Sequence, residues 1–321
     1  MNSTLAEAAG DTAPVPAALA PRPFGGTLLT LLRREFWEHR YLWMAPTAVA
    51  ALLALCAVLG RAHMNFENDS AFAGAGGFGE QQRVALATIV QWALSVPLYV
   101  VLLFVLSYYT LDCLYAERKD RSILFWKSLP VSDALTVTSK LLVALVVAPL
   151  LIFALALLTH LVFFAILGVR MAAGNIPALM SWSTLEWLRT ELVMLLVLVL
   201  AALWYAPVAA ALMLVSAWAR RSPFLWATVP PVLAPIIERI AFGTHFLWDF
   251  IRYRSEGIWR TLMDGYRFRI ITHKGLHPVG TLLSDLNFRG AFTDIDLWLG
   301  VLVAAALLFA AVRIRRYRDD T

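Results

Sequence analysis

The sequence predicts an all-α integral membrane protein with six transmembrane helices, preceded by an amphipathic helix at the membrane surface. Apolar residues make up 60% of the 321 residues and charged residues only 15%, whereas soluble globular proteins contain about 45–50% apolar and about 25% charged residues. The mean hydropathy is +0.70. So few charges cannot cover a chain of this size with a water-compatible surface. Soluble enzymes, disordered proteins and secreted disulfide scaffolds are therefore excluded.

The region before the first span is predicted to contain two different parts. Residues 1–24 are rich in Ala and Pro, lack the basic and apolar regions of a cleaved signal peptide, and are expected to be disordered. Residues 25–40 gather Leu28, Leu29, Leu32 and Phe36 on one arc of a helical wheel, with charged residues opposite. This pattern favours a helix that lies in the inner interface of the membrane. The alternative is a cytosolic extension of the first span.

Six segments are long and apolar enough to cross about 30 Å of hydrocarbon, which takes about 20 helical residues. The predicted spans are 41–60, 84–111, 141–168, 192–219, 223–242 and 294–313. The fifth contains Pro223, Pro230, Pro231 and Pro235, and proline removes a backbone donor and kinks a helix. We therefore expect this span to be broken and to pack inside the bundle, where neighbours satisfy the freed backbone groups.

The distribution of Lys and Arg predicts cytoplasmic N- and C-termini. Basic residues flank the first span, occupy the 112–140 loop, and crowd the tail that follows residue 313. This asymmetry follows the positive-inside rule for a multi-pass membrane protein. The 314–321 tail is then cytoplasmic, and the 243–293 segment is external. That segment also carries several arginines, but long loops cross the membrane with less regard to charge.

The net charge of +5 does not indicate a nucleic-acid partner, because no cluster of five or more Lys and Arg stands apart from apolar sequence. The basic residues sit at the ends of apolar segments, where they contact membrane lipids. The two cysteines, Cys56 and Cys113, suggest neither a disulfide framework nor a zinc site.

The loop at 112–140 is the most informative stretch. Charges crowd Glu117–Arg121, large apolar residues follow, and Pro130 ends any preceding helix. Ser132 or Asp133 can then cap a helix that enters the third span. An exposed apolar patch within a charged rim is typical of a docking site for a cytosolic partner, although folding back onto the membrane surface is an alternative. The expected docking residues are Glu117, Arg118, Lys119, Asp120, Arg121, Phe125, Trp126, Leu129 and Pro130.

The run Glu117-Arg118-Lys119-Asp120-Arg121-Ser122-Ile123-Leu124, closing with Ser128-Leu129-Pro130-Val131-Ser132, resembles the first cytoplasmic loop of ABC-2 type permeases, the membrane subunits of bacterial ABC exporters. The resemblance extends in outline to the interfacial helix, the six spans and the external segment. It implies a coupling helix seated in a groove of a cytosolic ATP-binding subunit. It also implies two permease chains, identical or similar, assembled with two such subunits.

The sequence contains no G-x-x-x-x-G-K-[ST] phosphate-binding loop. The chain is therefore not expected to hydrolyse ATP by that mechanism or to be an enzyme. We expect no cofactor on this chain, with ATP and Mg²⁺ bound by the partner subunit.

Four polar residues within the apolar spans are candidates for a translocation path or gate, because burying such groups is costly. They are Gln91, His160, Glu238 and Arg239. For Gln91 and His160, an interhelical hydrogen bond that holds the bundle is the alternative. For Glu238 and Arg239, the alternative is a position at the outer interface, where the arginine reaches water.

Other functional classes have weaker support. His273 and His277 have helical metal-ligand spacing, but no H-E-x-x-H motif accompanies them and Pro278 follows, so no metal site is expected. A secondary active transporter is the main alternative and would show repeated halves with matching broken helices. An intramembrane enzyme is a further alternative, although G-x-S-x-G is absent. The cargo is not identified by the sequence.

Overall fold

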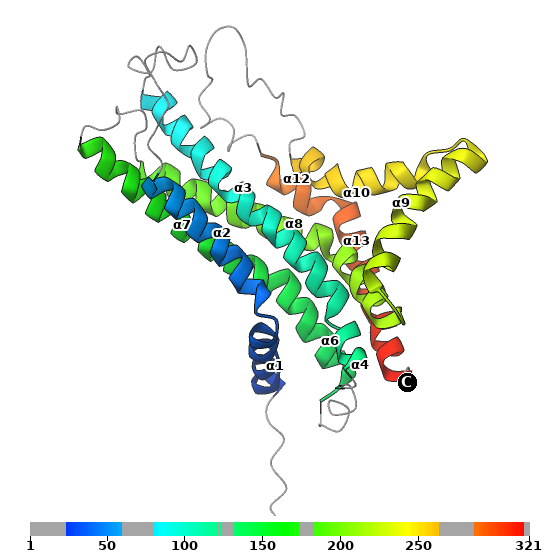
Figure 1. The fold of residues 1–321 in the computed structure, drawn as a ribbon. Helices are drawn as coiled ribbons and strands as arrows, with labels where there is room; N and C mark the ends of the chain where they lie inside the picture. Colours follow the sequence, from blue (N-terminus) through cyan, green and yellow to red (C-terminus); the bar gives the residue numbers. More distant parts are fainter. Residues whose placement is uncertain are drawn as a thin grey trace, which may run out of the picture.

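The computed structural model describes residues 24–59, 80–120, 122, 131–173, 183–262 and 286–317. Within these ranges every regular element is a helix, which confirms the all-α prediction (Figure 1). Six helices are long and apolar enough to cross a membrane. They cover Tyr41–Leu59, Leu86–Lys119, Asp133–Ala172, Thr184–Trp218, Pro223–Phe242 and Ile295–Tyr317.

The elements are, in order, α1 (Phe24–Glu38), α2 (Tyr41–Leu59), α3 (Glu80–Asp112), α4 (Tyr115–Lys119), α6 (Asp133–Leu142), the π-helical turn η2 (Val143–Val147), α7 (Ala148–Ala172), α8 (Thr184–Trp218), α9 (Pro223–Phe242), α10 (Phe246–Leu262), α12 (Phe288–Thr293) and α13 (Ile295–Tyr317). The third span is the continuous helix formed by α6, η2 and α7. The spans therefore begin and end close to the predicted positions, but several extend further.

Side-chain caps set two of the helix starts. The Ser132 hydroxyl accepts a hydrogen bond from the Leu135 amide at 3.2 Å, which confirms the predicted cap before the third span. The Ser183 hydroxyl accepts from the Glu186 amide at 3.4 Å at the start of α8. Each cap satisfies a backbone donor that has no partner within its helix.

Five spans form one bundle in which α2, α3, α7 and α8 run side by side and α13 packs along α8 (Figure 1). The largest apolar cluster includes Leu98, Tyr109, Ile152 and Met213, all fully buried. The α1 helix, α4 and the C-terminus lie at one end of the bundle, called here the α1 end (Figure 1). The start of α3 and helices α10 and α12 lie at the other end, the α10 end (Figure 1).

The fifth span differs from the prediction in two ways. α9 is one continuous helix, although Pro230, Pro231 and Pro235 lie inside it. It also lies outside the bundle, where it forms an arm with α10 (Figure 1), and most of its apolar side chains are exposed in the single chain. The expectation of a broken, internally packed span is therefore wrong. Closely spaced prolines fix φ near the helical value, and a helix on the outside has no neighbours to pack around a break.

The α1 helix forms where the amphipathic helix was predicted, but a different face is buried. Leu31, Glu35 and His39 form the buried stripe, four residues apart and thus on one side of the helix. Leu29, from the predicted apolar arc, is 68% exposed. α1 packs against α6, so it is attached to the bundle through a face that contains a carboxylate.

The predicted external segment, 243–293, contributes α10 and α12 at the α10 end. α10 packs on α8 through Trp204, whose indole N–H donates to the Arg254 carbonyl at 2.9 Å. The Arg254 guanidinium lies 4.5 Å from the centre of the Trp204 ring. Tyr253 donates to the Asp296 carboxylate at 2.5 Å and so connects α10 to α13. These contacts fix the position of α10 against two spans.

Candidate functional site: a buried ion-pair network beside the 112–140 loop

The two ends of the 112–140 loop are described, and its middle is not. α4 leads into the loop and α6 leads out of it. Of the expected docking residues, Glu117, Arg118, Lys119 and Asp120 belong to the described part. Arg121, Phe125, Trp126, Leu129 and Pro130 lie outside the described residues, and so does the apolar patch that they were predicted to form.

The start of α4 is fixed to the end of α8. The Ser216 hydroxyl accepts hydrogen bonds from the amides of Leu114 and Tyr115, at 3.1 and 3.0 Å. The Arg118 guanidinium donates to the carbonyls of Ser216 and Ala219, at 2.6 and 2.8 Å. Ser216 lies in the last turn of α8 and Ala219 follows its last residue, so no further helical amide is available to either carbonyl. Arg118 therefore caps α8 and is not part of a free charged rim.

Glu117 also departs from the prediction, because it points into the protein and is only 4% exposed. Its carboxylate lies 3.1 Å from the ammonium of Lys140 in α6. It also forms a short ion pair with Arg315 of α13. Lys119 and Asp120 are exposed, as a docking rim requires. The described part of the charged run, Glu117 to Asp120, thus divides into two inward residues that anchor the loop and two outward residues.

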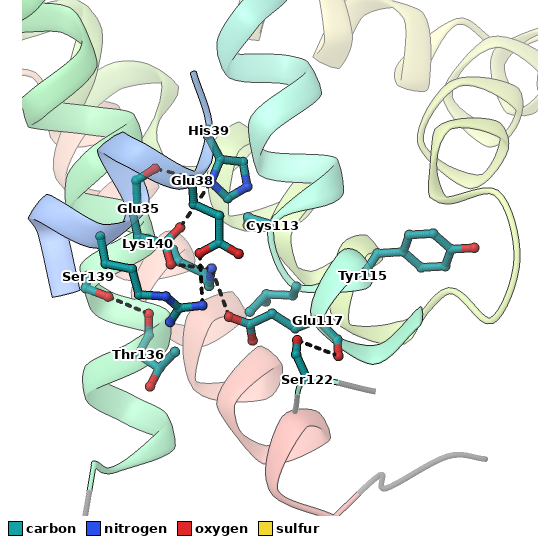
Figure 2. A network of polar contacts seen from close by, with 12 residues as sticks. Glu35, Glu38, His39, Cys113, Tyr115, Glu117, Ser122, Thr136, Ser139 and Lys140 are labelled. Atoms are coloured by element: carbon teal, nitrogen blue, oxygen red, sulfur yellow. Dashed lines mark hydrogen bonds and ion pairs between the residues drawn. The ribbon is translucent and has the colours of Figure 1, made fainter. Parts of the chain in front are cut away.

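Lys140 lies at the centre of the network, between two carboxylates from different elements (Figure 2). Its ammonium is 2.6 Å from Oε1 of Glu35 in α1. The second oxygen of Glu35 accepts a hydrogen bond from the Tyr109 hydroxyl of α3 at 3.1 Å and lies 3.6 Å from the His39 ring. Lys140 and Glu35 are each 1% exposed, so solvent hardly screens their attraction.

Arg315 closes the network on the side of the C-terminal helix. Its Nε donates to the Asp133 carboxylate, in the first turn of α6, at 3.0 Å. Its terminal nitrogen pairs with Glu117. The planar guanidinium can bind two carboxylates with fixed geometry, which a lysine ammonium does not do in the same way. Arg315 therefore joins Glu117, in the first part of the 112–140 loop, to Asp133, in its last part.

The network, defined here as Glu35, Tyr109, Glu117, Asp133, Lys140 and Arg315, connects α1, α3, α4, α6 and α13. It offers no metal site, since the described residues contain no group of three or more His, Cys, Asp or Glu arranged for a metal ion. Its charges are already paired with one another. The network can transmit movement between helices. If α4 or α6 moves, either α1 and α13 move with it or the buried ion pairs between them separate, which is costly.

A second polar cluster lies within the spans and contains two of the residues predicted to line a path. Gln91 of α3 donates to Glu191 of α8 at 2.7 Å. The Nδ1 atom of His160, in α7, lies 2.7 Å from the same carboxylate oxygen, and its Nε2 lies 3.0 Å from the Ser95 hydroxyl. The predicted alternative, an interhelical hydrogen bond, is therefore confirmed for both Gln91 and His160.

Glu238 and Arg239 lie at the end of α9, on the arm. The Glu238 carboxylate accepts hydrogen bonds from the Thr244 hydroxyl at 2.6 Å and from the amides of Phe246 and Leu247, both at 2.8 Å. It therefore caps the start of α10 and fixes the corner between the two helices. Arg239 is exposed. Within the single chain, neither residue lies between the helices of the bundle.

Comparison of this chain with protein-family models, with curated proteins and with solved structures finds no match.

Proposed function

We propose that this chain is the permease subunit of an ATP-driven exporter of the ABC-2 type, in a bacterial inner membrane. In this proposal the α1 end faces the cytoplasm, where a separate ATP-binding subunit docks on the 112–140 loop. Two permease chains, identical or similar, assemble with two such subunits. ATP and Mg²⁺ bind to the partner, which supplies the hydrolysis that drives transport.

The observation that carries the proposal is the anchoring of both ends of the loop in one buried network. Glu117, in the first part of the 112–140 loop, and Asp133, in its last part, both pair with Arg315. Glu117 and Lys140 then extend the connection to Glu35 in α1. A partner that pushes on the loop therefore pushes on α1 and α13 as well. A loop that only connects two spans needs no such buried charges, which cost several kcal/mol each to desolvate.

The test uses the full chain, purified together with a candidate ATP-binding subunit, one whose gene lies beside this one and whose sequence contains a phosphate-binding loop. Trp126→Ala and Phe125→Ala should release the partner, because large aromatic anchors carry most of the energy of an interface, about 2 kcal/mol or more each. Lys119→Ala is the control, since an exposed rim charge contributes about 0–1 kcal/mol. Retention of the partner and of full ATPase stimulation by both aromatic variants would sink the docking proposal. So would robust ATP hydrolysis by this chain alone.

A secondary active transporter is the second candidate, and the buried Glu191–His160 pair is the observation that favours it. Ionisable residues inside a membrane bundle often belong to ion pathways. The two candidates differ in their source of energy. If the chain is an ABC-type permease, a variant of the ATP-binding subunit that binds ATP but does not hydrolyse it should stop transport. If the chain is a secondary active transporter, collapse of the ion gradient should stop transport instead.

A further inference from the structure

The cluster of Gln91, Ser95, His160 and Glu191 lies inside the bundle and is not explained by the proposed docking function. Each of these four residues is at most 4% exposed. They come from three spans, α3, α7 and α8. Glu191 follows the first residue of α8 by seven positions, about 10 Å along a helix axis. The cluster is thus closer to the α10 end than to the ion-pair network.

We infer that this cluster is a binding site for a single proton, shared between Glu191 and His160. The inference does not rest on the proposed function, because it holds for a transporter driven by ATP or by an ion gradient. It rests on the charge balance of the cluster, on its hydrogen bonds and on a small cavity that reaches it.

Charge balance sets the number of protons. Glu191 is a carboxylic acid, and the basic side chain paired with it among the described residues is His160. An imidazole beside a carboxylate carries one negative charge, and one added proton makes the pair neutral. A second added proton would make it positive. The state with one added proton is thus the one that leaves no uncompensated charge inside the membrane protein, where such a charge is costly.

The side chains of the cluster can form hydrogen bonds both with and without that proton. With the proton on the ring, Nδ1 of His160 donates to Glu191 and Nε2 donates to the Ser95 hydroxyl. That hydroxyl then donates to the backbone carbonyl of Gln91 at 3.2 Å. Without it, Nε2 accepts from the same hydroxyl, which rotates toward the ring. A serine hydroxyl is suited to this role because it donates one hydrogen bond and also accepts. Gln91 donates to Glu191 in both states.

Two further observations point to a ligand. Oε2 of Glu191 is buried and has no hydrogen-bond partner in the described part of the structure, so one oxygen remains available for a proton or a water molecule. A cavity of about 10 Å³ lies between α3, α7 and α8 and reaches Gln91, Thr88 and Glu186. One water molecule needs about 10–15 Å³ of such space. The cavity thus provides a place for water next to Gln91.

Other ionisable and polar groups around the pair differ from it in exposure or partners. Glu186 and Arg189, on the same helix, face each other at 3.9 Å and are partly exposed. The hydroxyl of Tyr99, in α3, is buried without a hydrogen-bond partner in the described residues. Met194 contributes a thioether that accepts weakly from Ser95 at 3.6 Å. None of these contacts supplies a fixed positive charge to Glu191.

The order Ser95–His160–Glu191 is also that of a hydrolase triad, but access argues against nucleophilic catalysis. Ser95 is 1% exposed, and it is not among the residues that line the cavity. A nucleophile must reach the substrate carbonyl, and a stabilising oxyanion site must lie close by. The amides around Ser95 belong to the interior of α3, where they are already bonded within the helix.

The test follows protonation in the full chain, reconstituted in lipid nanodiscs. Infrared difference spectra between alkaline and acidic pH should contain, in the wild type, a buried carboxyl or imidazolium signal that depends on Glu191. Glu191→Gln should abolish it, because a proton added to His160 beside a neutral amide would leave an unpaired buried charge. Glu191→Gln keeps the shape and the acceptor oxygen for Gln91 and His160. Glu256→Gln is the control, because this carboxylate of α10 is 54% exposed and does not line the cavity, so the variant should leave the buried signal unchanged.

His160→Gln keeps the inference testable if Glu191→Gln does not fold. The buried signal of this variant should remain but come entirely from a carboxyl group, because Glu191 then binds the proton alone. Identical spectra of the wild type and Glu191→Gln would overturn the assignment, as would loss of the Glu191-dependent signal in Glu256→Gln. Covalent labelling of Ser95 by a fluorophosphonate would also overturn it, since that reaction identifies an accessible serine nucleophile.

Discussion

The ammonium of Lys140 lies 2.6 Å from the carboxylate of Glu35, although 105 residues separate the two in the sequence. Glu35 belongs to the helix before the first span, and Lys140 to the start of the third. The pair therefore attaches α1 to the helix that leaves the cytoplasmic loop of the proposed permease. α1 is thus a part of the bundle as well as a helix suited to the membrane surface.

Replacing Lys140 with Met should destabilise the protein strongly. The change leaves Glu35 and Glu117 buried without the cation between them, and breaking a buried pair by removing one partner typically costs about 3–5 kcal/mol. Arg252→Ala is the control, because Arg252 and Glu256 are 59% and 54% exposed and such pairs contribute about 0–1 kcal/mol. Unfolding of the purified chain in mixed micelles, titrated with a denaturing detergent, measures the difference.

The double variant Glu35→Gln/Lys140→Met separates charge from packing in this prediction. It removes one of the two carboxylates left without a partner and should recover part of the lost stability. A double variant as unstable as Lys140→Met would show that the lysine acts through its packing and not through its charge.

Arg315→Lys tests whether one cation must hold both ends of the loop. A lysine keeps the charge but presents a compact ammonium, so it cannot reproduce the fork that meets Glu117 and Asp133. We expect a loss of about 1–3 kcal/mol from the carboxylate left without a partner and weaker ATPase stimulation in the assembled complex. Arg316→Lys, at the exposed next position, is the control. Equal stimulation by the two variants would contradict a role for Arg315 in coupling.

Hydropathy and local signals predicted much of the fold. The six spans follow from the length of the apolar segments, and the cap at Ser132 follows from a polar residue after Pro130. The interhelical bonds of Gln91 and His160 could be expected from polar side chains inside apolar helices. These features depend on residues close together in the sequence or on the membrane itself.

The pairings that make up the candidate site could not be predicted in the same way. Glu117 was expected in an exposed rim, but α4 has only five residues, and the side that faces the bundle depends on how α8 and α13 pack around it. Glu191 stands at the border of a predicted span, where a charged residue is ordinary. Only the packing of α3 and α7 against α8 shows that it is buried. A carboxylate within a helical apolar face, as at Glu35, was the one available signal.

The proposed orientation of the chain can be tested at two positions that lie at opposite ends of the bundle. Asp120 is exposed after α4, at the α1 end, and Ala173 is exposed after α7, at the α10 end. In a background without Cys56 and Cys113, an impermeant thiol reagent added to spheroplasts should modify Ala173→Cys and leave Asp120→Cys unmodified. Disruption of the membrane should expose both. The opposite pattern before disruption would invert the proposed topology and place the loop outside.

Gly257 marks the contact between α10 and α8, where a small side chain is needed. A Cβ atom at this position would lie 2.6 Å from Cζ2 of Trp204, closer than a contact between carbon atoms allows. Trp204 is 1% exposed. It cannot easily move aside, because its indole donates to the Arg254 carbonyl and its ring packs against the Arg254 guanidinium.

Gly257→Ala should therefore destabilise the chain by about 1–3 kcal/mol, the usual cost of overpacking. Gly168→Ala in α7 is the matched control, because a Cβ there would meet nothing within 4 Å. Alanine in a helix interior is favoured over glycine by about 0.8–1.0 kcal/mol, so this variant should be neutral or more stable. Detergent unfolding of both variants checks the prediction. If Gly257→Ala stabilises the chain as much as Gly168→Ala does, α10 is not held against Trp204 as the structure describes.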